Sequence, residues 1–116
     1  GAALPKVPAF PTQELVNTSW AVARLSFSEG PLVHTLASAA LARVPQYRAR
    51  DLTNTAWSLA RLRHADAALL RSLTDAAIRR IADCIPQELS NLAWACATLR
   101  WMDAVLLDAI AAQAIA

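Results

Sequence analysis

Apolar residues recur along this chain at the three- and four-residue spacing of amphipathic helices, and short polar or proline-containing segments separate the runs. Between residues 32 and 44, for example, Leu32, Leu36 and Ala40 fall on one helical face. The pattern predicts an all-α protein with six helices. Their expected ranges are about 12–26, 32–44, 49–63, 66–83, 86–100 and 103–116.

Residues at the ends of these runs suit the starts of helices. Thr12, Asp66 and Asp103 are expected N-caps, because their side-chain oxygens can accept a hydrogen bond from the first turn. Pro86 suits the first position of a helix, where no backbone N–H is needed. Three of the first eleven residues are proline, so residues 1–11 are expected to form an extended lead-in.

A thirteen-residue segment occurs three times, at the start of every second predicted helix. The copies are QELVNTSWAVARL from Gln13, RDLTNTAWSLARL from Arg50 and QELSNLAWACATL from Gln87. Corresponding residues lie 37 positions apart, and five of the thirteen are identical in all copies. These are Leu15, Leu52 and Leu89; Asn17, Asn54 and Asn91; Trp20, Trp57 and Trp94; Ala23, Ala60 and Ala97; and Leu25, Leu62 and Leu99.

The repeat determines the predicted fold. A helix pair of this size cannot bury both faces of its helices alone, so successive pairs are expected to stack on one another. The prediction is an α-solenoid of three two-helix repeats, over about residues 12–47, 48–84 and 85–116. The last repeat is expected to be truncated, and flanking repeats or a partner protein are expected to cover the apolar ends.

Composition supports packed helices and excludes other classes. Apolar residues make up 56% of the 116, with two Gly and six Pro, which excludes low-complexity disorder. Charged residues interrupt every apolar run before the ~18 residues that span a membrane. The net charge is only +2. Two cysteines are too few for a disulfide framework and favour a reducing compartment.

The first helix of each repeat leaves a narrow stripe outside its broad apolar arc. The inner curve of a solenoid is expected to present these stripes as a ladder of Asn and Arg. The repeated tryptophans lie on the apolar arc and are interpreted as core residues, whereas Trp101, at a turn, is expected to meet a partner. The three stripes are Glu14, Asn17, Ala21 and Arg24; Asp51, Asn54, Ser58 and Arg61; and Glu88, Asn91, Ala95 and Thr98.

The polar residues of this ladder are the candidate binding site. Each repeated Asn could read a nucleotide base or, alternatively, tether the neighbouring repeat by bonding its backbone. Arg24 and Arg61 could contact phosphate or stack on bases, or could pair with acidic residues of an adjacent repeat. The densest basic patch adds three further arginines. The candidate RNA-binding residues are Asn17, Arg24, Asn54, Ser58, Arg61, Asn91, Arg43, Arg48 and Arg50.

Catalytic and metal-binding patterns are missing from the sequence. It has no glycine-rich phosphate-binding loop, no G-x-S-x-G and no H-E-x-x-H. His34 and His64 are not spaced with Cys84 or Cys96 as zinc ligands would be. The chain is therefore predicted not to be an enzyme, with no catalytic residue, metal or cofactor.

The repeated segment resembles the L-x-N-x-x-W-A-x-A-x-L first helices of organellar helical-repeat families related to octotricopeptide repeats. It is most similar to the 37-residue heptatricopeptide type, and the resemblance extends from Thr12 onward. The resemblance implies an α-solenoid in mitochondria or plastids that binds single-stranded or ribosomal RNA. It implies a role in transcript maturation, stability or translation, or as a ribosome component.

Two functions fit these observations. The first is RNA binding through the Asn and Arg ladder, with the basic patch contacting the phosphate backbone. The second is a scaffold role, in which the apolar ends and the outer face dock protein subunits of a large organellar complex. The small net charge and the 56% apolar content favour the scaffold role.

Overall fold

The computed structural model describes residues 4–25 and 30–115, and over these residues it contains six α-helices, three 3-10 helices and no strand. The all-α class is therefore confirmed. The α-helices are α1 (Thr12–Arg24), α2 (Gly30–Arg43), α3 (Ala49–Arg61), α4 (Ala67–Arg79), α5 (Pro86–Leu99) and α6 (Ala104–Ala114). The 3-10 helices η1 (Leu4–Ala9), η2 (Val44–Gln46) and η3 (Ile81–Asp83) precede α1, α3 and α5.

The helix ends differ from the predicted ranges by a few residues. Helix α2 begins at Gly30, two residues before its predicted start. The run predicted to reach residue 83 ends as an α-helix at Arg79 and continues as η3. Residue 26, the predicted end of the first helix, lies outside the described residues.

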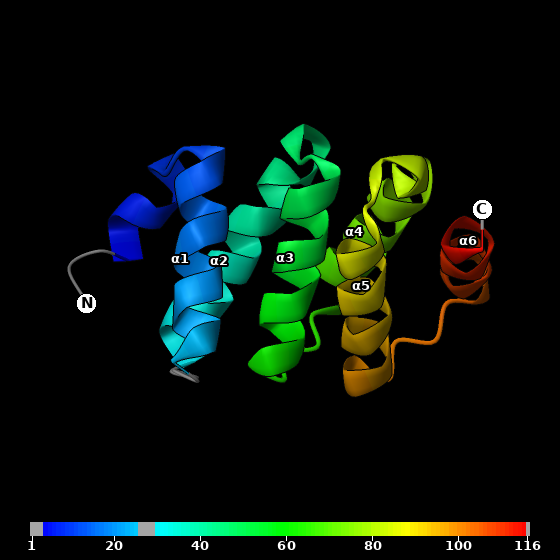
Figure 1. Cartoon of the computed structure of the whole chain (residues 1–116). Helices are drawn as coiled ribbons and strands as arrows, with labels where there is room; N and C mark the ends of the chain where they lie inside the picture. Colours follow the sequence, from blue (N-terminus) through cyan, green and yellow to red (C-terminus); the bar gives the residue numbers. More distant parts are fainter. Residues whose placement is uncertain (1–3, 26–29, 116) are drawn as a thin grey trace.

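The helices form two layers (Figure 1). Helices α1, α3 and α5 lie side by side in the first layer, and α2, α4 and α6 form the second. Each first-layer helix packs against the second-layer helix that follows it, and the most extensive packing joins successive helices of the first layer. The molecule is elongated, with principal dimensions of 46 × 24 × 22 Å. The first layer therefore presents one continuous surface along the molecule.

Two of the three predicted N-caps are confirmed. The Oδ1 atoms of Asp66 and Asp103 accept hydrogen bonds from the backbone N–H three residues on, at 3.0 and 2.9 Å. Thr12 is not an N-cap, because α1 begins one residue earlier than this role requires, with Pro11 in the cap position. The Thr12 hydroxyl instead donates to Oε1 of Gln46 at 3.1 Å.

Each first-layer helix has an acidic residue in its first turn, and in two of the three helices this residue caps the helix. Asp51 and Glu88 each accept a hydrogen bond from the backbone N–H of their own N-cap residue, at 3.1 and 3.0 Å. Glu14 occupies the same place in α1, but Pro11 has no N–H to donate. Helix initiation thus explains Asp51 and Glu88, whereas Glu14 is left exposed.

Arginines close two of the first-layer helices in a conformation that usually belongs to glycine. Arg63 and Arg100 have φ values of 54° and 56°, in the left-handed region. The N–H of the next residue, His64 or Trp101, donates at 2.9 Å to a carbonyl five residues earlier, which is the Schellman pattern. A left-handed residue with a Cβ costs about 1–2 kcal/mol.

The proline-rich lead-in is not extended as predicted. Leu4–Ala9 forms η1, because the φ near −65° that proline imposes also fits a 3-10 helix. Val7 of η1 is buried, as is Val44 of η2, which lies 37 residues later. The 37-residue pattern therefore extends back into the lead-in.

Buried apolar side chains form two clusters. The first joins α1 to α4 and includes Leu15, Leu36, Leu52 and Leu69. The second joins α3 to α6 and includes Ala56, Leu89, Leu106 and Ile110. Because α3 and α4 contribute to both clusters, the core runs along the whole molecule.

Tyr47, the single tyrosine of the chain, is among the largest fully buried side chains. Burial raises the pKa of its hydroxyl to about 12, because the phenolate would lose its solvation inside the core. Folding therefore favours the neutral form of this side chain.

Candidate nucleic-acid interface

One surface crosses the outward side of α1, α3 and α5. We call it the tryptophan face and define it by four positions in each helix, spaced by three or four residues so that they share one side. All twelve side chains are exposed or half-buried, and none is acidic. They are Gln13, Asn17, Trp20 and Arg24 in α1; Arg50, Asn54, Trp57 and Arg61 in α3; and Gln87, Asn91, Trp94 and Thr98 in α5.

Three tryptophans form a row along the middle of the tryptophan face. The ring centroids of Trp20 and Trp57 are 6.2 Å apart with planes inclined by 31°, and those of Trp57 and Trp94 are 6.4 Å apart with planes inclined by 34°. The guanidinium carbon of Arg24 lies 4.9 Å from the Trp20 ring centroid, within cation–π range. Trp20 and Trp94 remain 39% and 44% exposed, so the row presents aromatic surface to solvent.

The interpretation of the repeated tryptophans as core residues was wrong. Each Trp follows the repeated Asn by three positions and therefore shares its side of the helix. The predicted stripe instead joined Asn17 to Ala21, one position further, because the apolar character of Trp outweighed its spacing. The Asn-x-x-Trp spacing was the signal that could have found these residues.

The expectation that Trp101 meets a partner was also wrong, because Trp101 has contacts inside the molecule. Its Nε1 donates to Oγ1 of Thr74 in α4 at 2.8 Å, and its ring packs against both buried clusters. Because its polar atom is bonded and its ring is largely covered, Trp101 has a structural role between the layers.

Small side chains bring the first-layer helices close together. The flanks of α3 that meet α1 and α5 carry buried Ala, Ser and Thr residues. The hydroxyls of Thr53 and Ser58 donate to carbonyls of α3 itself, at 3.1 and 2.8 Å, whereas the buried hydroxyl of Thr55 has no hydrogen-bond partner among the described residues. Close helix packing of this kind allows neighbouring tryptophan rings to come within stacking distance.

Ser58 does not lie on the surface as predicted. It is 2% exposed and Ala95 is 1% exposed, whereas Ala21 at the same repeat position is exposed. The difference arises because a preceding helix covers this flank of α3 and α5 and no described helix covers it in α1. We therefore leave Ser58 out of the candidate interface.

The three repeated asparagines lie on the tryptophan face as exposed or half-buried side chains. The Oδ1 atoms of Asn17 and Asn91 accept hydrogen bonds from the side-chain amides of Gln13 and Gln87, at 2.9 and 3.2 Å. Within residues 4–25 and 30–115, none of the three Asn side chains bonds the backbone of another helix. The predicted alternative of a tether between repeats therefore has no support.

Arg24 and Arg61 lie exposed near the C-terminal ends of α1 and α3. Neither forms an ion pair with an acidic side chain of the described residues. The predicted alternative of pairing across repeats is thus not seen. Both guanidinium groups are free to contact an anion at this border of the tryptophan face.

The basic patch near α3 is divided. Arg48 and Arg50 are exposed and line open clefts at the N-terminal ends of the first-layer helices. Arg43 is half-buried, and its Nη1 donates to the Thr12 hydroxyl at 3.4 Å. Arg48 and Arg50 therefore form a second basic border on the opposite side of the tryptophan row from Arg61.

Other kinds of site have little basis in the described part of the chain. No group of three or more His, Cys, Asp or Glu side chains there could hold a metal ion. None of the helices described is long and apolar enough to cross a membrane. Cys84 and Cys96 are buried as free thiols, and burial raises the pKa of both.

Comparison with known families gives one match. A family described as RNA-editing substrate-binding complex 6 protein (RESC6) matches residues 5–116. The chain belongs to the RESC6 family. No curated protein and no solved structure matches the chain significantly.

Membership of the RESC6 family agrees with a part in an RNA-related complex. Both predicted functions share this feature. The match covers η1 except its first residue and all six α-helices, so the RESC6 pattern includes the whole tryptophan face. The closer resemblance to heptatricopeptide and octotricopeptide repeats stays a prediction.

Proposed function

We propose that this chain is a non-catalytic module that binds single-stranded RNA on the tryptophan face. The observation that carries the proposal is the row of exposed Trp20, half-buried Trp57 and exposed Trp94. Arg24 lies over one end of this row, and none of the twelve side chains is acidic. Aromatic surfaces that stack with bases, bordered by cations, are the usual means of binding single strands.

The proposed RNA path crosses the helices along the tryptophan row. Bases stack on or between the indoles, and each stacked base contributes about 1–3 kcal/mol. Arg61 and Arg50 lie eleven residues apart on α3, about 16 Å at 1.5 Å per residue, and contact phosphates on the two sides of the row. The Asn amides beside the rings offer donors and acceptors to base edges.

Stacking tolerates any base, so we expect modest sequence preference from this face. Three repeats present three rings, which limits the contact to about three nucleotides and makes the affinity of the chain alone weak. The proposed architecture is an α-solenoid of three stacked repeats with the 37-residue period, in which the tryptophan face follows the first-layer helices.

The proposed setting is an assembly of the kind that the RESC6 name describes, an RNA-editing substrate-binding complex. An organellar location is part of this proposal, and the family match is compatible with the mitochondrion. A plastid location has no such support.

Fluorescence anisotropy of a labelled single-stranded RNA tests the proposal. The expected result is weak binding whose affinity falls with rising salt, because Arg side chains release counterions from phosphates. Duplex RNA of the same length is expected to bind more weakly, since its bases are not free to stack. Absence of binding at low salt, or equal affinity for the duplex, would contradict the proposal.

A protein scaffold role is the second candidate, and the apolar cleft between α5 and α6 favours it. Affinity purification with and without nuclease separates the two functions. Partner proteins that remain after nuclease treatment support a scaffold, and partners lost with the RNA support the RNA-binding module.

A further inference from the structure

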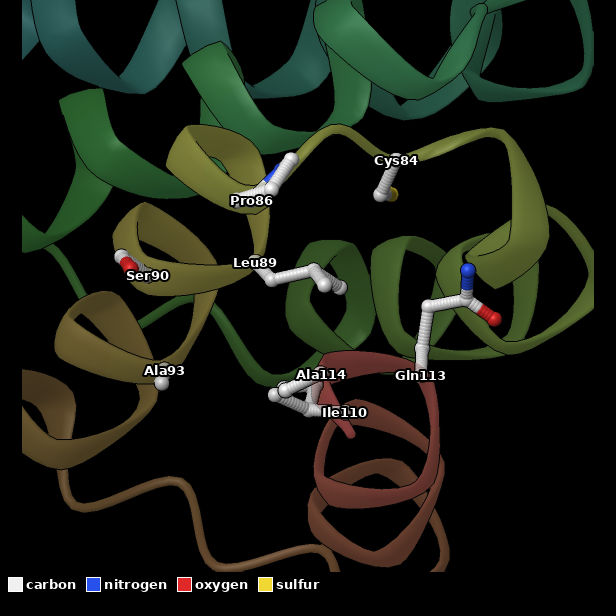
Figure 2. A pocket seen from close by; sticks show the side chains of 8 residues that line it. All are labelled: Cys84, Pro86, Leu89, Ser90, Ala93, Ile110, Gln113 and Ala114. Atoms are coloured by element: carbon white, nitrogen blue, oxygen red, sulfur yellow. The ribbon is translucent and has the colours of Figure 1, made fainter. Parts of the chain in front are cut away.

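An apolar cleft of ≈ 330 Å³ opens between α5 and α6, at the end of the molecule that carries the C-terminus. Figure 2 shows Leu89 of α5 approaching Ile110 and Ala114 of α6 across this cleft, with Cys84 at one side. Ser90 and Ala93 belong to the same lining. Leu89, Ile110 and Cys84 are buried, whereas Ser90 and Ala114 are exposed and Ala93 is half-buried. No described helix lies over the last three.

The cleft corresponds to a buried junction one repeat earlier. Along α5 the uncovered row, which we call the C-face, is Pro86, Ser90, Ala93 and Ala97. Its counterparts 37 residues earlier in α3 are buried beneath α5, with exposures of 7%, 0%, 4% and 1% for Ala49, Thr53, Ala56 and Ala60.

The second layer shows the same relation at Ala114 but not at Ile110, which is buried at 8% exposure. Ile110 and Ala114 of α6 line the cleft, and Ala114 is exposed. Their counterparts Leu73 and Ala77 in α4 are 3% and 1% exposed. The cleft therefore has the lining of the receiving half of a repeat junction, and no described helix fills it.

The opposite end of the described structure carries a row that corresponds to the other half of such a junction. The row of α1 that faces away from α3, which we call the N-face, is Glu14, Thr18, Ala21 and Leu25. Its counterparts in α3 are Asp51, Thr55, Ser58 and Leu62, an acid, a Thr, a small residue and a Leu in the same order. In α3 the first three are buried against α1, whereas Leu25 of the N-face is 79% exposed.

We propose that the C-face of one molecule receives the N-face of a second copy of this chain. The contact continues the α1–α3 and α3–α5 junctions from one molecule to the next, with the same classes of residue on both sides. Because the two surfaces differ, the contact is heterologous and each copy keeps one free end. The tryptophan row then extends from Trp94 of one copy to Trp20 of the next. This association does not depend on RNA binding.

Two exposed residues allow each end to be blocked separately. Ser90→Arg places a long cation on the C-face, and Ala21→Arg places one on the N-face. Ala68→Arg, at an exposed position of α4 outside both faces, is the matched control. Circular dichroism verifies that each variant keeps its helices, and light scattering after size exclusion gives the mass.

The unchanged chain and Ala68→Arg are expected to show average masses that rise with concentration above the 12.5 kDa monomer. Ser90→Arg and Ala21→Arg are each expected to remain monomers. An equimolar mixture of these two variants is expected to form a dimer and nothing larger, because one intact C-face and one intact N-face remain.

Three results would overturn the proposal. The first is a monomer at every concentration for the unchanged chain. The second is association that both variants leave intact. The third is association that only one variant abolishes while the mixture gains nothing, because this would indicate a symmetric contact through one end. RNA binding that persists in monomeric variants leaves the proposed function standing, so the two proposals fail independently.

Discussion

The tryptophan face and the outer side of α4 are surfaces of the same small molecule with opposite chemistry. The tryptophan face collects three Trp, three Asn and three Arg from three helices, without an acid. The exposed side of α4 carries Arg71, Asp75 and Arg79, where opposite charges alternate at four-residue spacing. None of these three forms an ion pair with another described residue, so they are solvated surface.

The comparison shows that the net charge of a chain is a poor guide to its binding surfaces. A value of +2 favoured a scaffold over RNA binding in the sequence. The structure gathers Arg24, Arg50 and Arg61 on the tryptophan face, whereas the acidic Asp51, Asp83 and Glu88 lie in the clefts beside Arg48 and Arg50. Basic side chains beside exposed aromatic rings are suited to binding a single-stranded nucleic acid.

Removal of exposed indoles from the tryptophan face should produce the largest loss of RNA affinity, whereas removal of an apolar side chain elsewhere should not. Trp20→Ala combined with Trp94→Ala is expected to weaken RNA binding about 100-fold, because each lost stacking ring costs about 1–3 kcal/mol. Leu41→Ala is the control, since Leu41 in α2 is an apolar side chain with the same 39% exposure as Trp20 but lies off the face. Equal loss in the control, measured by anisotropy, would remove the distinction between the surfaces.

The core between the two layers should respond to alkaline pH. The pKa of Tyr47 is about 12 in the folded chain, above its ordinary value of 10, so the unfolded state loses this proton first. The free energy of unfolding is then expected to fall by about 2–3 kcal/mol as pH rises from 10 to 12 and to level off above that.

Denaturant titrations at several pH values measure this fall, and Tyr47→Phe is expected to abolish most of it. Ultraviolet titration of the phenolate gives the pKa directly, because Tyr47 is the single tyrosine of the chain. A phenolate that forms near pH 10 in the folded protein would show that the two layers do not enclose this side chain.

Removal of arginines from the tryptophan face should reduce the salt dependence of RNA binding, whereas removal of arginines from α4 should not. Arg24→Ala with Arg61→Ala is expected to weaken binding several-fold and to reduce the slope of log affinity against log salt by about 1.4, at about 0.7 per phosphate on a single strand. The matched pair Arg71→Ala with Arg79→Ala on α4 is expected to leave the slope nearly unchanged. Equal slopes for the two double variants would mean that the contact with RNA is not on the tryptophan face.

The smallest effect is expected at the boundary of the face. Arg63→Gly relieves a left-handed residue with φ of 54° and is expected to raise the free energy of unfolding by about 0.5–1 kcal/mol. RNA affinity is expected to stay the same, because Arg63 ends the turn after α3 and is not one of the twelve positions. Thermal unfolding and anisotropy on the same sample check both expectations, and a loss of affinity would extend the face to this turn.

The helices were predictable because their signals are local. The cap residues Asp66 and Asp103 and the start at Pro86 each act within one turn of helix, and the 37-residue spacing shows which helices correspond. Pro11 shows where the local signal misleads, since proline in the cap position displaces Thr12 into the helix.

The candidate site was only partly predictable, because exposure depends on neighbouring helices. Asn17 and Arg24 lie on the surface as predicted, but Ser58 shares its repeat position with the exposed Ala21 and is buried because α1 covers it. An apolar side chain such as Trp20 is usually core, and only the arrangement of three helices shows that its ring lies at the surface. The repeat spacing fixes which residues share a side, and packing decides which side faces solvent.

The central claim is that single-stranded RNA contacts the tryptophan row. Nuclear magnetic resonance of the four indole N–H groups tests it most directly, because Trp101 is held by Thr74 at 2.8 Å and serves as an internal reference. Added RNA is expected to shift the signals of Trp20, Trp57 and Trp94 and to leave the Trp101 signal in place. RNA that binds without moving those three signals, or that moves all four equally, would contradict it.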